Sequence, residues 1–169
     1  ACALYGEKAL SVIDIGGQDT KIIRVEDGRV TDFLMNDKCS AGTGRFLDVM
    51  ASTLGLSSEQ LYALAVRGGG VHISSMCTVF AESEVVGLIG RGEEKKNIAY
   101  AVVDSIATKV AAQASRLLPE SGTVCLTGGL CEARVLVDAL SSALNREIVT
   151  CPDGRYAGAL GAALLAGGF

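Results

Sequence analysis

The sequence VIDIGGQDTK, residues 12–21, brings a run of β-branched residues directly into paired glycines. A second junction of this kind is VCLTGG, residues 124–129. Where a strand runs into glycines, backbone N–H groups are exposed and can bind phosphate oxygens without interference from a side chain. Any tight hairpin can carry one Gly-Gly pair, but two pairs, together with Gly42-Thr43-Gly44 at the start of a predicted helix, favour a phosphate-binding site. The glycines at the two junctions are Gly16, Gly17, Gly128 and Gly129.

Two polar residues flank the first glycine pair and suit chemistry at a phosphate. Asp14 precedes the glycines and could hold Mg²⁺ through water, because hard cations prefer carboxylate oxygen. Gln18 follows them and could orient an attacking water, as glutamine does in other nucleotide hydrolases. The chain matches neither the Walker pattern nor the dinucleotide GxGxxG pattern, so those two classes of nucleotide-binding protein are disfavoured.

The segments around these junctions predict one α/β domain over residues 1–169. Strands are expected over 9–15, 20–25 and 29–35, joined by a hairpin turn at 26–28, which makes an antiparallel meander. A β–α–β–α pattern follows later, with helices on both faces of the sheet. The expected helices are 44–54, a short helix capped by Ser57 and Ser58, 79–89, 95–118, 132–144 and 157–166, and the further strands are 123–127 and 147–150.

Composition excludes several classes of function. The net charge of −4 and pI near 5.0 argue against a nucleic-acid surface, which needs clustered Lys and Arg. No apolar run approaches the roughly 20 residues that span a bilayer. The opening residues ACALYGEKAL lack the basic start and apolar stretch of a signal peptide, so a cytoplasmic location is expected.

Two of the six cysteines are candidate metal ligands. Cys39 and Cys77 each stand at the start of a predicted helix, where the helix dipole stabilises a thiolate or an anionic cluster. They lie 38 positions apart, and two ligands are too few for an iron–sulfur cluster, which normally takes four thiolates. A twofold dimer would supply four, two from each subunit. The other four are expected to be structural or incidental, and wide spacing argues against disulfides: Cys2, Cys125, Cys131 and Cys151.

Five motifs make a more specific resemblance, which runs over essentially the whole chain. The order of the elements resembles the second half of the actin, hexokinase and Hsp70 superfamily, where ATP lies between two ribonuclease-H-like halves. The motifs themselves are similar to the activator ATPases of 2-hydroxyacyl-CoA dehydratases and the ATPase subunits of benzoyl-CoA reductase, the BadF/BadG/BcrA/BcrD type. They are DIGGQDTK (14–21), NDKCSAGTGRFLDVMA (36–51), SSMCTVFAESEV (74–85), LTGG (126–129) and RYAGALGAALLA (155–166).

This resemblance implies a function and assigns roles to residues. In that family one [4Fe-4S] cluster bridges a homodimer, and the matching ligands here are Cys39 and Cys77. ATP hydrolysis, with Mg²⁺, changes the angle between the helices that meet at the cluster and drives one low-potential electron to an iron–sulfur dehydratase or reductase. Gly16-Gly17 matches the second phosphate loop, and Thr127-Gly128-Gly129 matches the adenosine motif.

Family members begin with another half-domain that carries the first phosphate loop, and no such segment precedes Ala9. We therefore expect the chain to be the second half, with half of the ATP cleft. Two alternatives stay open: a sugar or carboxylate kinase domain of the same superfamily without a cluster, and a non-catalytic dimerisation fragment. The single histidine, His72, is expected to be a hydrogen-bonded structural residue rather than a ligand.

Overall fold

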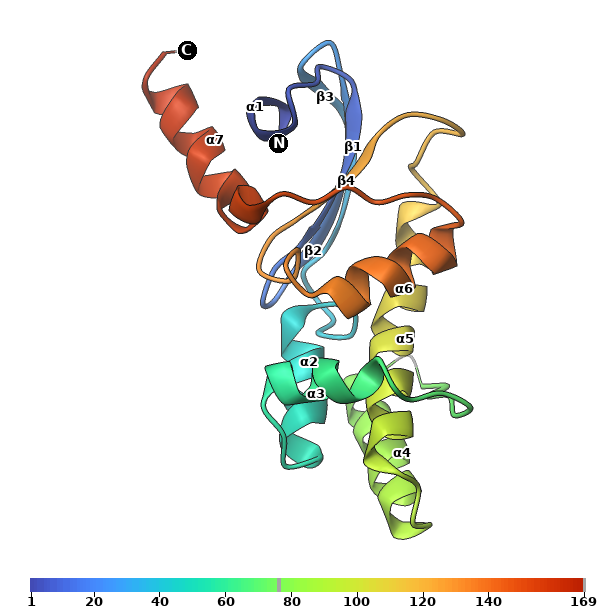
Figure 1. Ribbon diagram of the computed structural model, residues 1–169. Coiled ribbons are helices and arrows are strands. Elements are labelled where there is room, and N and C mark those ends of the chain that lie inside the picture. The colour runs from blue at the N-terminus through green and yellow to red at the C-terminus, as the bar shows by residue number, and fades with distance from the viewer. Residues whose placement is uncertain (76, 169) are drawn as a thin grey trace.

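A four-stranded mixed sheet organises the chain in the computed structural model, which describes residues 1–75 and 77–168 (Figure 1). The spatial order of the strands is β3-β2-β1-β4, with β1 antiparallel to β2, β2 antiparallel to β3, and β1 parallel to β4. Since parallel strands end at the same edge of a sheet, both Gly-Gly junctions lie at one edge. The strands are β1 Leu10–Ile15, β2 Thr20–Glu26, β3 Arg29–Asn36 and β4 Val124–Thr127.

The hairpin between β2 and β3 is closed by the two residues Asp27 and Gly28. Both have positive φ, 50° and 73°, which is the signature of a type I′ turn. This turn has the twist that antiparallel strands require, and Asp-Gly is one of the few dipeptides that adopt it at low cost. The register that follows pairs Glu26 with Arg29. The predicted meander is confirmed.

Helices cover both faces of the sheet, as expected. In Figure 1, α1 and α7 lie on one side, α5 and α6 lie on the other, and α2, α3 and α4 extend beyond the end of the sheet. None of the helices in the described part of the chain has both the length and the apolar character needed to cross a bilayer. The helices are α1 Cys2–Tyr5, α2 Gly44–Thr53, α3 Ser58–Ala65, α4 Thr78–Gly90, α5 Lys95–Ala114, α6 Arg134–Leu144 and α7 Ala157–Ala166, with a 3₁₀ turn η1 over Pro152–Tyr156.

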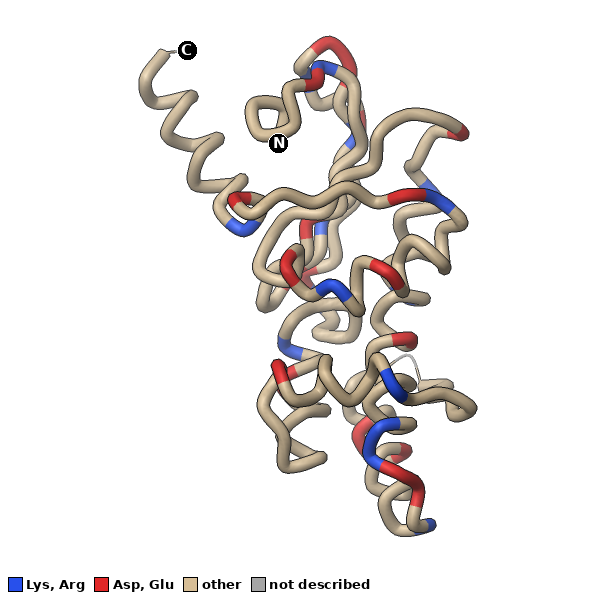
Figure 2. The backbone as a smooth tube through the Cα atoms, viewed as in Figure 1, with Lys and Arg blue, Asp and Glu red and all other residues tan. Residues whose placement is uncertain are grey.

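The core is built around α5, which packs against α2, α3, α4 and α6. The main apolar cluster joins these helices to one face of the sheet through Ile13, Ile15 and Ile22. A smaller cluster on the other face packs Leu10 and Val12 of β1 against residues of α1. At the turn between α4 and α5, acidic and basic residues are interleaved, as Figure 2 shows and as the 2.9 Å pair of Lys96 with Glu94 illustrates.

Two expectations were wrong in detail, and two short elements had not been expected. The expected strand over 147–150 is reduced to one parallel bridge, in which Val149 exchanges backbone hydrogen bonds with β4. This bridge lies between Asn145, the left-handed C-cap of α6, and Pro152, which has no N–H to donate and begins η1. Helix α5 ends at Ala114 rather than 118, where the Ser115 hydroxyl donates back to the Ala111 carbonyl. Helix α1 and the turn η1 had not been expected.

Candidate functional site

The first glycine turn is closed by its own backbone. The Gly16 N–H donates to the Asp19 carbonyl at 2.9 Å. A Cβ on Gly16 would lie 2.5 Å from the Asp19 carboxylate, whereas a Cβ on Gly17 would meet no atom within 4 Å. Gly17 and Gln18 are exposed. The turn therefore presents Gly17 and Gln18 to solvent and uses Gly16 for packing.

The start of α2 is fastened to this turn. The amides of Gly44 and Arg45 donate to the carbonyls of Gly16 and Gly17 at 2.9 and 2.8 Å. The Thr20 hydroxyl donates to the Gly42 carbonyl at 2.5 Å, within a fully buried contact. The structure thus brings Gly42-Thr43-Gly44 against the first junction, although all three residues are buried and the Gly44 amide already donates to Gly16. Their contact with phosphate stays a prediction.

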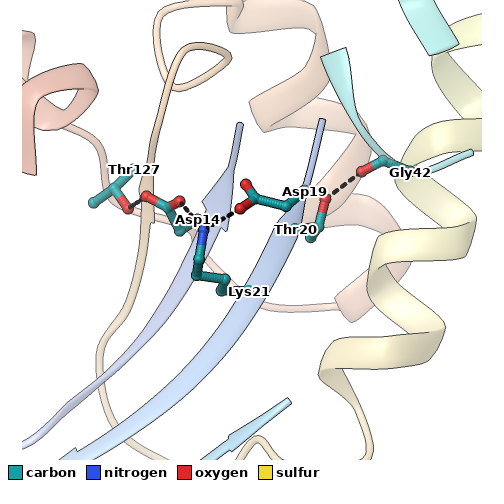
Figure 3. A network of polar contacts seen from close by, with 6 residues as sticks. All are labelled: Asp14, Asp19, Thr20, Lys21, Gly42 and Thr127. Atoms are coloured by element: carbon teal, nitrogen blue, oxygen red, sulfur yellow. Dashed lines mark hydrogen bonds and ion pairs between the residues drawn. The ribbon is translucent and has the colours of Figure 1, made fainter. Parts of the chain in front are cut away.

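Asp14 is the centre of a polar network that joins the two junctions (Figure 3). Its carboxylate accepts a 2.6 Å hydrogen bond from the hydroxyl of Thr127, which lies opposite Asp14 in the parallel pairing of β1 with β4. The Lys21 ammonium lies 3.9 Å from Asp14 and 2.6 Å from Asp19. Asp14 is thus held as a fixed, partly exposed carboxylate at the sheet edge. Its role toward Mg²⁺, and that of Gln18 toward water, stay predictions.

The second glycine pair divides into one structural and one open position. Gly128 has φ +86°, and its Cβ would lie 2.7 Å from the carbonyl carbon of Ile15. Its N–H donates to the Gly154 carbonyl at 3.1 Å, which links the junction to η1. Gly129 is exposed, and a Cβ there would meet nothing within 4 Å. Of this second pair, Gly129 is therefore the glycine whose backbone a ligand can approach.

The two candidate ligand cysteines sit in different local settings. Cys77 is exposed and is the N-cap of α4, as predicted. Cys39 is half-buried and does not begin a helix, since α2 starts at Gly44 with Thr43 as its N-cap. The reason is the turn after Cys39, where the Thr43 amide and hydroxyl both donate to the Ser40 carbonyl. Asn36 holds Cys39 from both sides, accepting from its N–H at 3.3 Å and donating to its carbonyl at 2.8 Å.

Hydroxyl and carboxylate contacts join the segments that carry the cysteines. The hydroxyls of Ser40 and Thr78, each one residue after a cysteine, lie 2.8 Å apart. Glu84 on α4 accepts from the Ser74 N–H at 2.8 Å, from the Ser74 hydroxyl at 2.9 Å and from the Ser75 hydroxyl. The bond from Ser75 is the main reason why the pKa of Glu84 lies below its usual value. The approach to Cys77 is thus tied to the helix that follows it.

All six cysteines are free thiols. Cys125 and Cys131 are buried, and burial raises the pKa of Cys125 to about 12 and that of Cys131 above its ordinary value. Both are inert packing residues, as expected for them. His72 differs from its expectation, because its side chain is 80% exposed and lies 3.6 Å from the Asp104 carboxylate.

The sequence did not predict the residues whose side chains hold the candidate site residues in place. Lys21 had a readable signal, since β2 pairs antiparallel with β1 and the register places it beside Asp14. Ser40, Thr78 and Glu84 gave no comparable signal, because their contacts depend on the path of the chain between helices. In the described part of the chain, no three His, Cys, Asp or Glu side chains gather as metal ligands, so Cys39 and Cys77 remain two ligands in one chain.

Comparison with known proteins decides the family. The model of the BadF/BadG/BcrA/BcrD ATPase family matches residues 1–166. The chain belongs to this family. It is 48% identical over 157 residues to the (R)-2-hydroxyglutaryl-CoA dehydratase activating ATPase of Acidaminococcus fermentans, covering 92% of this chain and 60% of that protein.

Solved structures agree with this family assignment. The crystal structure of component A of the (R)-2-hydroxyglutaryl-CoA dehydratase of Acidaminococcus fermentans matches with a TM-score of 0.91 and 45% identity, over 97% of this chain and 63% of that one. The activator of the 2-hydroxyisocaproyl-CoA dehydratase from Clostridium difficile, with bound ADPNP, matches with a TM-score of 0.88 and 39% identity, over 94% and 60%. The chain thus has the activator fold and spans about 60% of the length of these relatives.

Proposed function

We propose that this chain is the cluster-bearing part of an ATP-dependent activator that delivers a low-potential electron to an iron–sulfur dehydratase or a benzoyl-CoA reductase-type component. The observation that carries the proposal is a continuous set of contacts from the glycine turn to the cysteines. The Gly16 and Gly17 carbonyls hold the start of α2, and the turn before α2 contains Cys39 and Ser40. Ser40 in turn contacts Thr78, beside Cys77. We therefore expect a movement of the first glycine turn to be transmitted to both thiols.

The thiols fit one half of an iron–sulfur site. Two unpaired cysteines on neighbouring segments provide soft sulfur ligands, and the N-terminus of α4 favours negative charge at Cys77. A [4Fe-4S] cluster takes four thiolates and supplies one-electron chemistry. A homodimer that places two copies of the pair face to face completes the set. The exposed Val79 and Phe80, 65% and 66% accessible, lie two and three residues after Cys77 and provide apolar surface beside the proposed interface.

The residues of the sheet edge have the character of a nucleotide site. Gly17 and Gly129 present backbone at exposed positions, so they are the glycines we assign to phosphate and adenosine. Asp14 is oriented by Thr127 and Lys21, which suits a carboxylate that holds Mg²⁺ through water. Gln18 is assigned to the attacking water. The bound ADPNP of the Clostridium difficile relative supports nucleotide binding by this protein.

The proposed partner rests on the relatives, and the proposed location rests on the cysteines. The names of the relatives assign them to 2-hydroxyacyl-CoA dehydratases, and we extend that type of partner to this protein. Six free cysteines are in keeping with a reducing cytoplasm, where we place the protein. We propose the complete activity only for a chain of the relatives' length, about 60% of which this chain spans.

Iron and sulfide analysis of anaerobically purified protein tests the cluster. We expect about four of each per dimer and absorbance near 400 nm. Cys39→Ser and Cys77→Ser should each abolish both signals, whereas Cys151→Ser, at a half-buried cysteine outside the proposed site, should retain them. A colourless wild-type protein without iron overturns the cluster and favours the kinase alternative.

A further inference from the structure

Lys109 reaches from the central helix α5 to the sulfur of Cys39. Its ammonium nitrogen lies 3.6 Å from the Cys39 Sγ atom, which is hydrogen-bond distance for a nitrogen donor and a sulfur acceptor. The two residues are 70 positions apart in the sequence, so the contact is a product of the fold. Both side chains are half-buried, and partial exclusion of water strengthens an interaction that involves a full charge.

The stem of Lys109 is guided to this position. It packs along Gly42, where an added Cβ would lie 3.7 Å from the lysine Cδ atom. Gly42 is itself held through its carbonyl by Thr20 of β2. The apolar stem of Lys109 thus lies alongside Gly42 while its ammonium reaches the sulfur.

Lys109 also borders the space between the two cysteine-bearing segments. It lines a pocket of about 430 Å³ together with Gly42, three residues after Cys39, and with Ser74 and Ser75, which precede Cys77. The ammonium therefore lies at the place where the segments carrying the two thiols approach each other.

We infer that Lys109 is a positioning residue that donates an N–H···S hydrogen bond to Cys39 and raises the reduction potential of the iron–sulfur group which Cys39 helps to hold. The inference rests on the proposed function. Net charge and hydrogen bonds to the sulfurs set such potentials. One-electron reduction adds one negative charge to the site, and a nearby ammonium stabilises the more negative state. A shift of α5 relative to the Cys39 turn would weaken this contact and make the electron easier to deliver.

The test compares Lys109→Met with Lys109→Arg and with Lys96→Met. The last variant removes a charge from the exposed start of the same helix and serves as the matched control. In redox titrations of the loaded dimer with dithionite, Lys109→Met should lower the reduced-to-oxidised ratio at a fixed potential by about tenfold. Lys109→Arg should restore most of the ratio, and Lys96→Met should leave it near wild type. An unchanged ratio in Lys109→Met overturns the inference.

A second readout needs no iron. In metal-free protein at one pH, the rate of iodoacetamide labelling at Cys39, divided by that at Cys77, reports the ammonium beside the first sulfur. Lys109→Met should lower this ratio several-fold, and Lys96→Met should not. If wild-type protein binds no iron but Lys109→Met still lowers the labelling ratio, the cluster is refuted and the lysine contact is retained. No change in the labelling ratio refutes the contact itself. Urea midpoints of all variants establish that each is folded.

Discussion

Gly128→Ala is expected to be the most damaging small substitution at the sheet edge. Gly128 has φ +86°, and an alanine in the left-handed region costs about 1–2 kcal/mol. The added methyl would also lie 2.7 Å from the carbonyl carbon of Ile15, and backbone cannot rotate away as a side chain does. Forcing extra atoms into a packed position costs about another 1–3 kcal/mol. We therefore expect a loss of about 2–5 kcal/mol in the free energy of unfolding.

The assay is urea unfolding followed by circular dichroism, with Gly129→Ala as the matched control. Gly129 is exposed, a Cβ there meets nothing within 4 Å, and its φ lies outside the left-handed region. Its substitution should change the free energy of unfolding by less than about 0.5 kcal/mol. A loss of nucleotide binding in Gly129→Ala can then be assigned to the ligand contact rather than to the fold. Equal stabilities of the two variants would refute the division of the pair into a packing glycine and an open one.

Three further outcomes follow from contacts at and around the site. Thr127→Val removes the 2.6 Å hydrogen bond to Asp14 at nearly constant volume, and should cost about 1–2 kcal/mol in urea unfolding at pH 7; an unchanged midpoint would mean that the bond contributes nothing. The pKa of Glu84 is lowered by the bond from Ser75, so its stabilising effect is present above the ordinary glutamate pKa and is lost as pH falls through the lowered value. Glu84→Gln should therefore destabilise the chain more at pH 7 than at pH 3, and a pH-independent difference between the two proteins would contradict this. Ser57→Ala breaks the capping box of α3 and should cost about 1 kcal/mol, whereas Ser52→Ala, at an exposed position of α2, should stay near wild type.

Local signals in the sequence predicted most of the elements. Helix α3 begins where Ser57 and Gln60 form a capping box, and the β2–β3 hairpin turns at an Asp-Gly pair, so both could be located from a few residues. The strand predicted over 147–150 was wrong because three β-branched residues in a row suit a strand, whereas in the structure only Val149 of this segment pairs with β4.

The site was predictable in its residue types and not in its pairings. Glycines that follow strands, and cysteines in specific motifs, can be recognised from the sequence alone. The contact of Ser40 with Thr78 spans 38 positions, and that of Lys109 with Cys39 spans 70, so each depends on how the helices cross. The split between Gly16 and Gly17, or between Gly128 and Gly129, depends on which backbone lies nearby.

The two cysteines are anchored differently, and this difference bears on the motion that we propose between the glycine turn and the cysteines. Cys39 belongs to the turn before α2, which is fastened to the glycine turn by the amides of Gly44 and Arg45. Cys77 is the N-cap of α4, and the segment before it is fastened to the same helix by Glu84. A displacement of the glycine turn therefore acts first on Cys39, while Cys77 follows α4. The hydrogen bond between the Ser40 and Thr78 hydroxyls links the turn before α2 to helix α4, one residue after each cysteine. A single neutral hydrogen bond contributes only about 1 kcal/mol, so under the proposed function we expect nucleotide binding to be able to break it, although it favours one arrangement at rest.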